Sequence, residues 1–206
     1  MQILRVSLIL ALVAASPAMA GTAAITIYPK AAGTVTRFPN FNLLFVQSDS
    51  DIQSTCFDTT GENLEFRRGF MEFRLPVPNH VVVRATLRLT ESRGVTTFPL
   101  PPDVHELSAY PADLVVDPAD YDAPTLDLAT FETDPNDDPS LSNLTFDVTD
   151  AVRHLGGRTI GFRIKLQIDP DAPCVEFQQA GSGFGGLYNN QPSLELEFGH
   201  TRGSTN

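Results

Sequence analysis

Two stretches of this chain alternate between apolar and polar residues, and this alternation restricts the fold more than any other feature. From residue 81 to 90 the odd positions are apolar, while Arg or Thr occupies the even positions from Arg84 onward. From residue 160 to 168, Ile, Phe or Leu alternates with Gly, Arg, Lys or Gln. A period of two places successive side chains on opposite faces of a β-strand. The pattern therefore predicts sheets with one buried and one solvated face.

Shorter alternating or apolar stretches predict further strands, and hardly any helix is expected. The predicted strands lie at residues 24–28, 42–47, 69–75, 127–131, 143–148 and 194–198. Thr149-Asp150 predicts the start of one or two helical turns, whereas residues 48–61 are expected to be polar loop and residues 181–183 a flexible tip. Many short strands between turns are typical of an all-β, antiparallel β-sandwich. We expect one such domain over residues 21–200, followed by a flexible tail at 201–206.

The alternation also predicts where one acidic side chain lies. If the strand at 69–75 pairs with the strand at 81–90, Glu72 would lie on the solvated face near Arg84 and Arg88. Opposite charges at such cross-strand positions contribute about 0.2–1 kcal/mol each. We interpret these side chains as a solvated face and not as a site.

The first twenty residues have the pattern of a secretion signal. One positive charge at Arg5 precedes an apolar run at residues 6–15, and Ala18-Met19-Ala20 provides a small-x-small cleavage pattern. This predicts a secreted or extracellular protein, a location that includes the periplasm and the cell surface, with no membrane span after cleavage. The formal net charge of −11 makes nucleic acid an unfavourable partner.

The only two cysteines are Cys56 and Cys174. An even count in an oxidising compartment predicts a disulfide bridge between them. The alternative is two separate buried thiols. Neither cysteine has a neighbouring base that would activate it as a nucleophile.

The most unusual feature of the charge distribution is an acidic segment. Residues 103–150 contain thirteen Asp or Glu residues and no Lys or Arg. Clustered loop carboxylates are the ligands that Ca²⁺ requires, although neither cluster has EF-hand spacing. The alternative interpretation is a solvated acidic loop that keeps the protein soluble. The candidate calcium ligands are Asp117, Asp120, Asp122, Asp134, Asp137 and Asp138.

Carbohydrate binding commonly uses amphipathic aromatic rings, and the chain has four Tyr residues and no Trp. Tyr110 and Tyr121 lie in or beside predicted loops, so they are the candidate sugar-binding residues; the alternative is that both are rim or core residues. No catalytic motif accompanies them, and the chain is expected not to be an enzyme. The four histidines, which form no HExxH or HxH pair, are His80, His105, His154 and His200.

Several motifs resemble those of the secreted DNRLRE-type domains. Residues 68–76 (RGFMEFRLP) and 85–89 (ATLRL) are similar to the core of that family, and residues 146–152 (FDVTDAV) are similar to its "fDVTxxV" turn. The similarity covers most of residues 65–198 and implies a jelly-roll β-sandwich grouped with carbohydrate-binding modules of exported bacterial proteins. Two features depart from the family: Arg74 stands where an acidic residue is usual, and no surface-sorting tail follows.

These observations predict a secreted, non-catalytic binding module for extracellular or cell-surface carbohydrate, assisted by calcium in one version of the hypothesis. The alternative is a structural or protein-interaction component of the cell exterior, with a cell-surface protein as its partner. The third and least favoured hypothesis is a polysaccharide-active enzyme.

Overall fold

The computed structural model describes residues 23–48, 52–58, 64–76, 82–92, 103–133, 142–155, 157–167, 179–185 and 190–199. The strands of the first half are β1 (Ala23–Ile27), β2 (Ala31–Phe38), β3 (Leu43–Ser48), β4 (Ile52–Asp58), β5 (Leu64–Arg74) and β6 (Val82–Ser92). Those of the second half are β7 (Asp103–Tyr110), β8 (Leu126–Thr133), β9 (Ser142–Asp147), β10 (Thr159–Leu166), β11 (Gln179–Phe184) and β12 (Ser193–Phe198). Short helices lie at η1 (Pro39–Phe41), η3 (Pro118–Asp122) and α1 (Thr149–His154).

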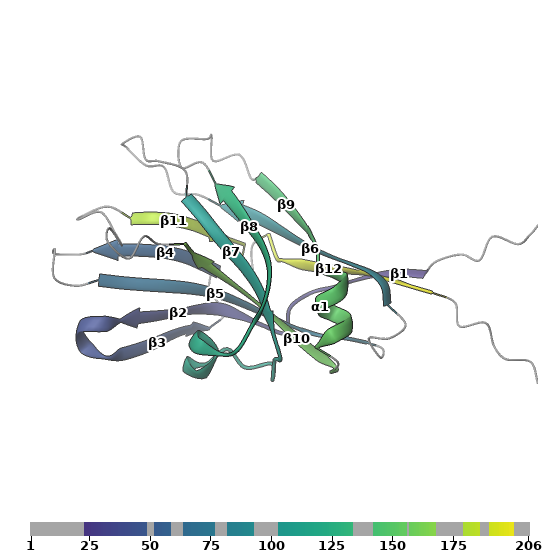
Figure 1. Cartoon of the computed structure of the whole chain (residues 1–206), viewed down its shortest axis with the longest axis horizontal. Coiled ribbons are helices and arrows are strands. Elements are labelled where there is room, and N and C mark those ends of the chain that lie inside the picture. Colours follow the sequence, from purple (N-terminus) through teal and green to yellow (C-terminus); the bar gives the residue numbers. More distant parts are fainter. Residues whose placement is uncertain are drawn as a thin grey trace, which may run out of the picture.

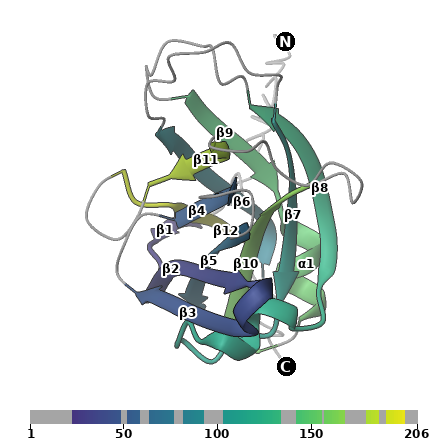
Figure 2. The ribbon, with the colours of Figure 1, turned by 90° about the vertical axis from the view of Figure 1, so that its left-hand side faces the viewer.

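The protein is all-β, as predicted, and its strand pairs are antiparallel. The hydrogen-bonded path runs β1-β12-β6-β11-β4-β5-β10-β7-β8, with β9 beside β6, β2 beside β5 and β3 beside β2 (Figure 1). The main core joins side chains from β5, β6, β10 and β12, including Phe73, Leu87, Ile164 and Leu196. The two parts of the path therefore face each other across this core, which is consistent with the predicted sandwich (Figure 2). The jelly-roll arrangement stays a prediction.

The period-two alternation is confirmed at its centre, because Leu87 and Ile164 are both 0% exposed. Two segments without a clear alternation are nevertheless strands. β4 lies in the segment expected to be polar loop, and β11 includes the expected flexible tip at residues 181–183; both expectations were wrong. β11 pairs with β4 over six residues, from Gln179↔Phe57 to Phe184↔Ile52. Backbone pairing with a neighbour, which no local pattern reveals, makes these segments strands.

The expected solvated face of β5 and β10 is in fact buried. Residues 111–125, here called the strap, cross this face between β7 and β8 (Figure 2). A second small core lies between the strap and the sheet, made of Val35, Phe70, Tyr110, Val116 and Tyr121. Beneath the strap this face is buried at Glu72, Gly161 and Arg163, whereas Arg74 is exposed and Lys165 partly exposed at its margins. A regular alternation therefore does not by itself show that a whole face is solvated.

The predicted neighbourhood of Glu72 was therefore wrong. β5 pairs with β10, β2 and β4, and β6 pairs with β12, β9 and β11. Arg84 and Arg88 approach Glu197 and Glu195 of β12 at 3.9 and 2.9 Å. Glu72 is fully buried beneath the strap.

The short helix predicted after residue 148 is confirmed as α1. Within the part of the chain that the structure describes, none of the helices combines the length and the apolar character needed to cross a membrane.

Candidate functional site

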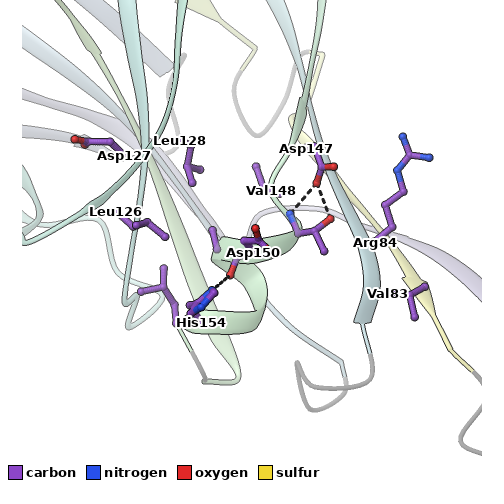
Figure 3. Close-up of a pocket in the computed structure, with 12 residues that line it drawn as sticks. Val83, Arg84, Leu126, Asp127, Leu128, Asp147, Val148, Asp150 and His154 are labelled. Carbon is purple, nitrogen blue, oxygen red and sulfur yellow. Dashed lines mark hydrogen bonds between the residues drawn. The ribbon is translucent and has the colours of Figure 1, made fainter.

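An open groove of about 870 Å³ lies between α1, the first residues of β8 and the start of β6 (Figure 3). Its apolar lining includes Val83, Leu126, Leu128 and Leu155, and its charged lining includes Arg84, Asp127, Asp147 and Asp150. Concave sites with apolar walls and a few oriented polar groups are typical small-ligand sites.

A register shift between β6 and β12 contributes to this groove. The pairing is regular up to Arg84↔Glu197, and the next pair is Val82↔Phe198. Past the shift Val82 is buried and Val83 is 42% exposed, which reverses the sides that strict alternation predicted for them. A β-bulge commonly redirects a side chain in this way next to a functional site. Here it turns Val83 into the wall of the groove.

Asp147 positions the start of α1. Its Oδ1 accepts hydrogen bonds from the backbone N–H of Thr149 at 3.0 Å and from the hydroxyl of Thr149 at 2.6 Å. These two bonds lower the pKa of Asp147 from its ordinary value, because they stabilise the ionised carboxylate. Asp147 is therefore a hydrogen-bond acceptor at neutral pH and is poorly suited to donate a proton as a general acid.

The other polar groups of the groove are more exposed. The side chain of Asp150 is 85% exposed and lies 4.0 Å from Arg153, while Asp127 is exposed on β8. The imidazole of His154 is hydrogen-bonded through Nδ1 to the carbonyl of Asp150 at 2.7 Å. Arg153 donates to the carbonyls of Val82 and Val83 and so attaches α1 to β6. Exposed carboxylates beside an apolar wall can accept hydrogen bonds from the hydroxyls of a ligand.

A second polar cluster lies beneath the strap. The hydroxyl of Tyr110 on β7 donates to Glu72 Oε1 on β5 at 2.8 Å. Gly161 of β10 stands between them in register, opposite both Glu72 and Tyr110. A Cβ atom at Gly161 would lie 2.3 Å from Cζ of Tyr110, so only glycine leaves room for this ring. Burial raises the pKa of Tyr110 and that of Glu72.

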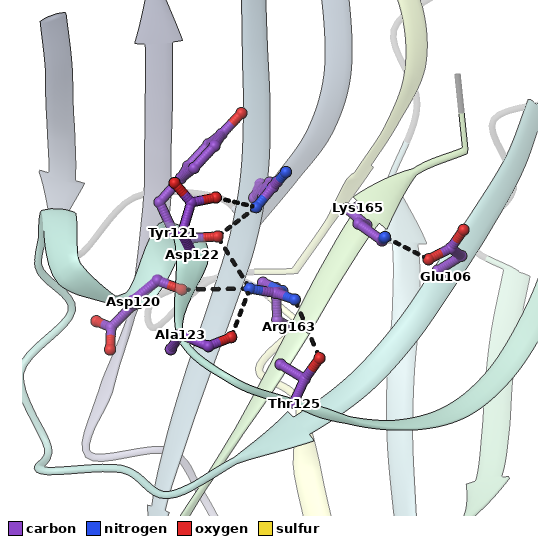
Figure 4. A network of polar contacts seen from close by, with 9 residues as sticks. Glu106, Asp120, Tyr121, Asp122, Ala123, Thr125, Arg163 and Lys165 are labelled. Atoms are coloured by element: carbon purple, nitrogen blue, oxygen red, sulfur yellow. Dashed lines mark hydrogen bonds and ion pairs between the residues drawn. The ribbon is translucent and has the colours of Figure 1, made fainter. Parts of the chain in front are cut away.

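Two arginines hold the strap to the sheet (Figure 4). Arg163 of β10 donates to the carbonyls of Tyr121 and Ala123 at 2.9 and 3.2 Å, and to the hydroxyl of Thr125 at 3.2 Å. Arg68 of β5 donates to the carbonyl of Tyr121, and its guanidinium lies 3.8 Å from the centroid of the Tyr121 ring. Burial lowers the pKa of Arg163, and the neighbouring positive charge of Arg68 lowers it further.

The candidate sugar-binding tyrosines are both in this cluster. Tyr110 is 0% and Tyr121 is 2% exposed, so neither ring is accessible to a ligand in solution while the strap is in place. This placement agrees with the alternative that both are core residues. Sugar binding through these rings stays a prediction.

The described calcium candidates, which all lie in the strap, also have partners. Asp117 accepts from the backbone N–H of Ala119, and Asp120 accepts from the backbone N–H of Asp117, which forms a capping box for η3. Asp122 pairs with Arg68 at 3.2 Å. In the described segments, no three His, Cys, Asp or Glu side chains come together as metal ligands. The remaining candidates, Asp134, Asp137 and Asp138, lie outside those segments, and calcium binding stays a prediction.

His105 on β7 is a buried histidine that the sequence gave no reason to select, and it joins β4 to β8. The two ring nitrogens of His105 lie 3.0 Å from the hydroxyls of Ser54 and Thr133. The ring stacks on Phe131 with centroids 5.3 Å apart. His105 and Ser54 are both fully buried, so this arrangement, although it pairs a serine with a histidine, joins strands and does not face a substrate.

Cys56 is fully buried on β4. Cys174 lies outside the described residues, so the bridge between the two stays a prediction.

Comparisons with known proteins give this chain no family. No protein-family model and no curated protein matches it. The resemblance to DNRLRE-type domains, which rests on short motifs of β5, β6 and α1, therefore stays a prediction.

The sequence did not single out the groove residues as a site, although it contained a signal for them. Asp127, Asp147 and Asp150 belong to the acidic segment at residues 103–150, but not to its two densest clusters. They come together because the start of β8, the end of β9 and α1 border the same groove. Spacing along the chain does not reveal this tertiary arrangement.

Proposed function

We propose that this protein is a secreted, non-catalytic binding module that holds a carbohydrate chain in the groove beside α1. The observation that carries the proposal is the composition of that groove, in which exposed carboxylates face an apolar wall. Sugars carry many hydroxyl donors and also apolar C–H faces, so they can use both kinds of surface.

The groove's size and openness suit a segment of a soluble glycan. Its volume of about 870 Å³ lies within the range of roughly 300–1,000 Å³ that is usual for ligand sites. None of its lining residues is Phe, Tyr or Trp. Flat stacking platforms are therefore not part of the proposal, and hydrogen bonds to Asp127 and Asp150 provide the specificity.

The proposal of a binder and not a catalyst rests on how the carboxylates are held. Asp147 accepts two hydrogen bonds from Thr149, which lower its pKa. A glycosidase requires, besides an ionised carboxylate, a carboxyl group with a raised pKa as its general acid, and Asp147 does not fit that role. Secretion is supported by the signal pattern at residues 1–20.

A glycan array followed by calorimetric titration tests this proposal. Asp127→Asn and Asp150→Asn should each weaken the affinity for the selected glycan about tenfold, which corresponds to roughly 1.4 kcal/mol. Glu195→Gln on β12 is the matched control, because Glu195 is an exposed carboxylate that pairs with Arg88 away from the groove. Binding that is unaffected by both groove variants would refute the assigned site, and cleavage of the glycan would refute the non-catalytic role.

One observation favours the alternative of a protein-interaction component. Near the edge strand β3, Phe41, Leu43 and Phe45 are 64, 53 and 53% exposed. β3 contains no charged residue to protect its open edge. If no glycan binds and the protein instead assembles without sugar, in a way that Phe45→Lys abolishes, this alternative replaces the first proposal.

A further inference from the structure

The strap and the sheet beneath it combine two energetically unfavourable features at one place. The carboxyl group of Glu72 is fully buried; Oε1 accepts from Tyr110, and Oε2 has no hydrogen-bond partner among the described residues. Directly above, Leu114 of the strap has a φ of 74°, in the left-handed region that a leucine rarely occupies. Backbone strain of this kind persists only where surrounding contacts enforce it.

The groups that face Glu72 do not neutralise a charge on it. From β7 the facing group is Tyr110, and from β2 the residue in register is Ala31. The strap contributes the carboxyl groups of Asp113 and Asp120, which repel an ionised Glu72, and the backbone N–H of Leu114, which favours it.

Arg163 of β10, two residues from Gly161, makes its hydrogen bonds with strap carbonyls and Thr125. Lys30, which precedes β2, donates its backbone N–H to the Glu72 carbonyl. Among the residues that the structure describes, an ionised Glu72 would thus be a buried charge without a cationic partner.

The opposing, favourable contacts come from Arg163 and Arg68, here called the clamp. Arg163 and Arg68 hold the strap by its carbonyl groups, and the small core of Val35, Phe70 and Tyr121 packs beneath it. A segment that is held by a few specific contacts against local strain and a buried carboxyl group has the features of a two-state element.

We propose that the strap is a pH-sensitive cover over the tyrosine-bearing face of β5, β10 and β7, closed while Glu72 is protonated and loosened when Glu72 ionises. Opening would expose the rings of Tyr110 and Tyr121, which are inaccessible in the closed form. This inference concerns a different part of the molecule from the groove and does not depend on the proposed function.

The direction of the pH dependence follows from proton linkage. Burial raises the pKa of Glu72 above its ordinary value of 4.5 in the closed form, and exposure on opening would restore it. The closed form therefore binds the proton more tightly. Closure is strongest below the ordinary value and weakens as pH rises toward the raised value, by at most about tenfold per pH unit for one proton. Burial also raises the pKa of Asp120, which acts in the same direction.

Amide hydrogen exchange of the full chain tests the proposal. Exchange is followed from about pH 4 to about pH 8 and corrected for the intrinsic chemical rate, with β12 as the internal reference. In the wild type, protection of residues 111–125 should fall several-fold or more as pH rises, relative to β12. In Glu72→Gln, which mimics the protonated carboxyl group, protection should stay high across the range.

Glu106→Gln is the matched control. Glu106 is a partly exposed carboxylate on β7 that pairs with Lys165 at 2.6 Å, so this variant should behave like the wild type.

Equal pH dependence in the wild type and Glu72→Gln, or no dependence in either, would overturn the proposal. If Glu72→Gln does not fold, a carbon-detected NMR titration of the Glu72 carboxyl group in the wild type decides instead. Titration well above the ordinary pKa, accompanied by shifts of strap resonances at the same midpoint, supports the cover; titration at the ordinary value refutes it.

Discussion

The groove beside α1 and the cluster beneath the strap draw carboxylates from the same acidic segment but place them in opposite environments. In the groove, Asp127 and Asp150 are exposed. Asp120 of the strap is half-buried and faces the fully buried Glu72 of β5. The first pair is in contact with water, whereas burial raises the pKa of Asp120 and that of Glu72. The comparison shows that an acidic sequence does not by itself identify a site, because burial decides the charge and availability of each carboxyl group.

The largest effect is expected from removing the clamp. Arg163→Met would leave the carbonyl of Ala123 and the hydroxyl of Thr125 without this charged donor, and the carbonyl of Tyr121 would keep only Arg68. We expect the free energy of unfolding to fall by about 3–5 kcal/mol, because buried acceptors that lose a charged donor are costly. Urea titration measures this. Lys165→Met, two residues along on β10 with a partly exposed ion pair, should lower it by less than about 1 kcal/mol. Equal effects of the two variants would show that the strap is not clamped by Arg163.

A smaller loss is expected from filling the space that Tyr110 occupies. Gly161→Ala places a methyl group 2.3 Å from the Tyr110 ring, so the ring and its hydrogen bond to Glu72 must shift. Overpacking of this kind costs about 1–3 kcal/mol. Thermal or urea unfolding measures the change. Gly157→Ala is the control, because its nearest neighbour would lie at 3.5 Å, and it should change the stability little.

The smallest effect is expected at the groove. Asp147→Ala removes the hydrogen bonds to Thr149 at the start of α1 and should cost about 1 kcal/mol at neutral pH. Thr149 lowers the pKa of Asp147, so this contribution is present above the ordinary value of 3.8 and is lost as pH falls through the lowered pKa. Urea titrations of both proteins at neutral and acidic pH measure the difference. Asp150→Ala, which removes an exposed side chain, is the control; a difference between wild type and Asp147→Ala that does not shrink in acid would contradict the capping role.

Much of the sheet could be predicted because its signal is local. The alternation around Leu87 and Ile164 identified two central strands and their buried faces, and Thr149-Asp150 marked the start of α1. β11 was missed because its glycines carry no alternation, and its pairing with β4 supplies the extended conformation. Val83 was placed on the wrong side because the shift between Arg84 and Val82 depends on the partner strand β12.

The surroundings of the candidate site residues could not be predicted from the sequence. Tyr110 and Tyr121 were chosen as amphipathic rings in or beside predicted loops, and the strap that buries them is a long-range feature. Glu72 looked like an ordinary solvated residue because its neighbours in sequence alternate normally.

The amino-acid sequence alone determined that this chain is built of antiparallel strands, since the period of its apolar residues acts within each strand. Only the tertiary structure decided that one regular wet face is covered, that Glu72 meets Tyr110 across Gly161, and that three scattered aspartates line one groove. The physical reason is that the solvent exposure of a side chain depends on which distant segments pack against it, and this packing exists only in the folded protein.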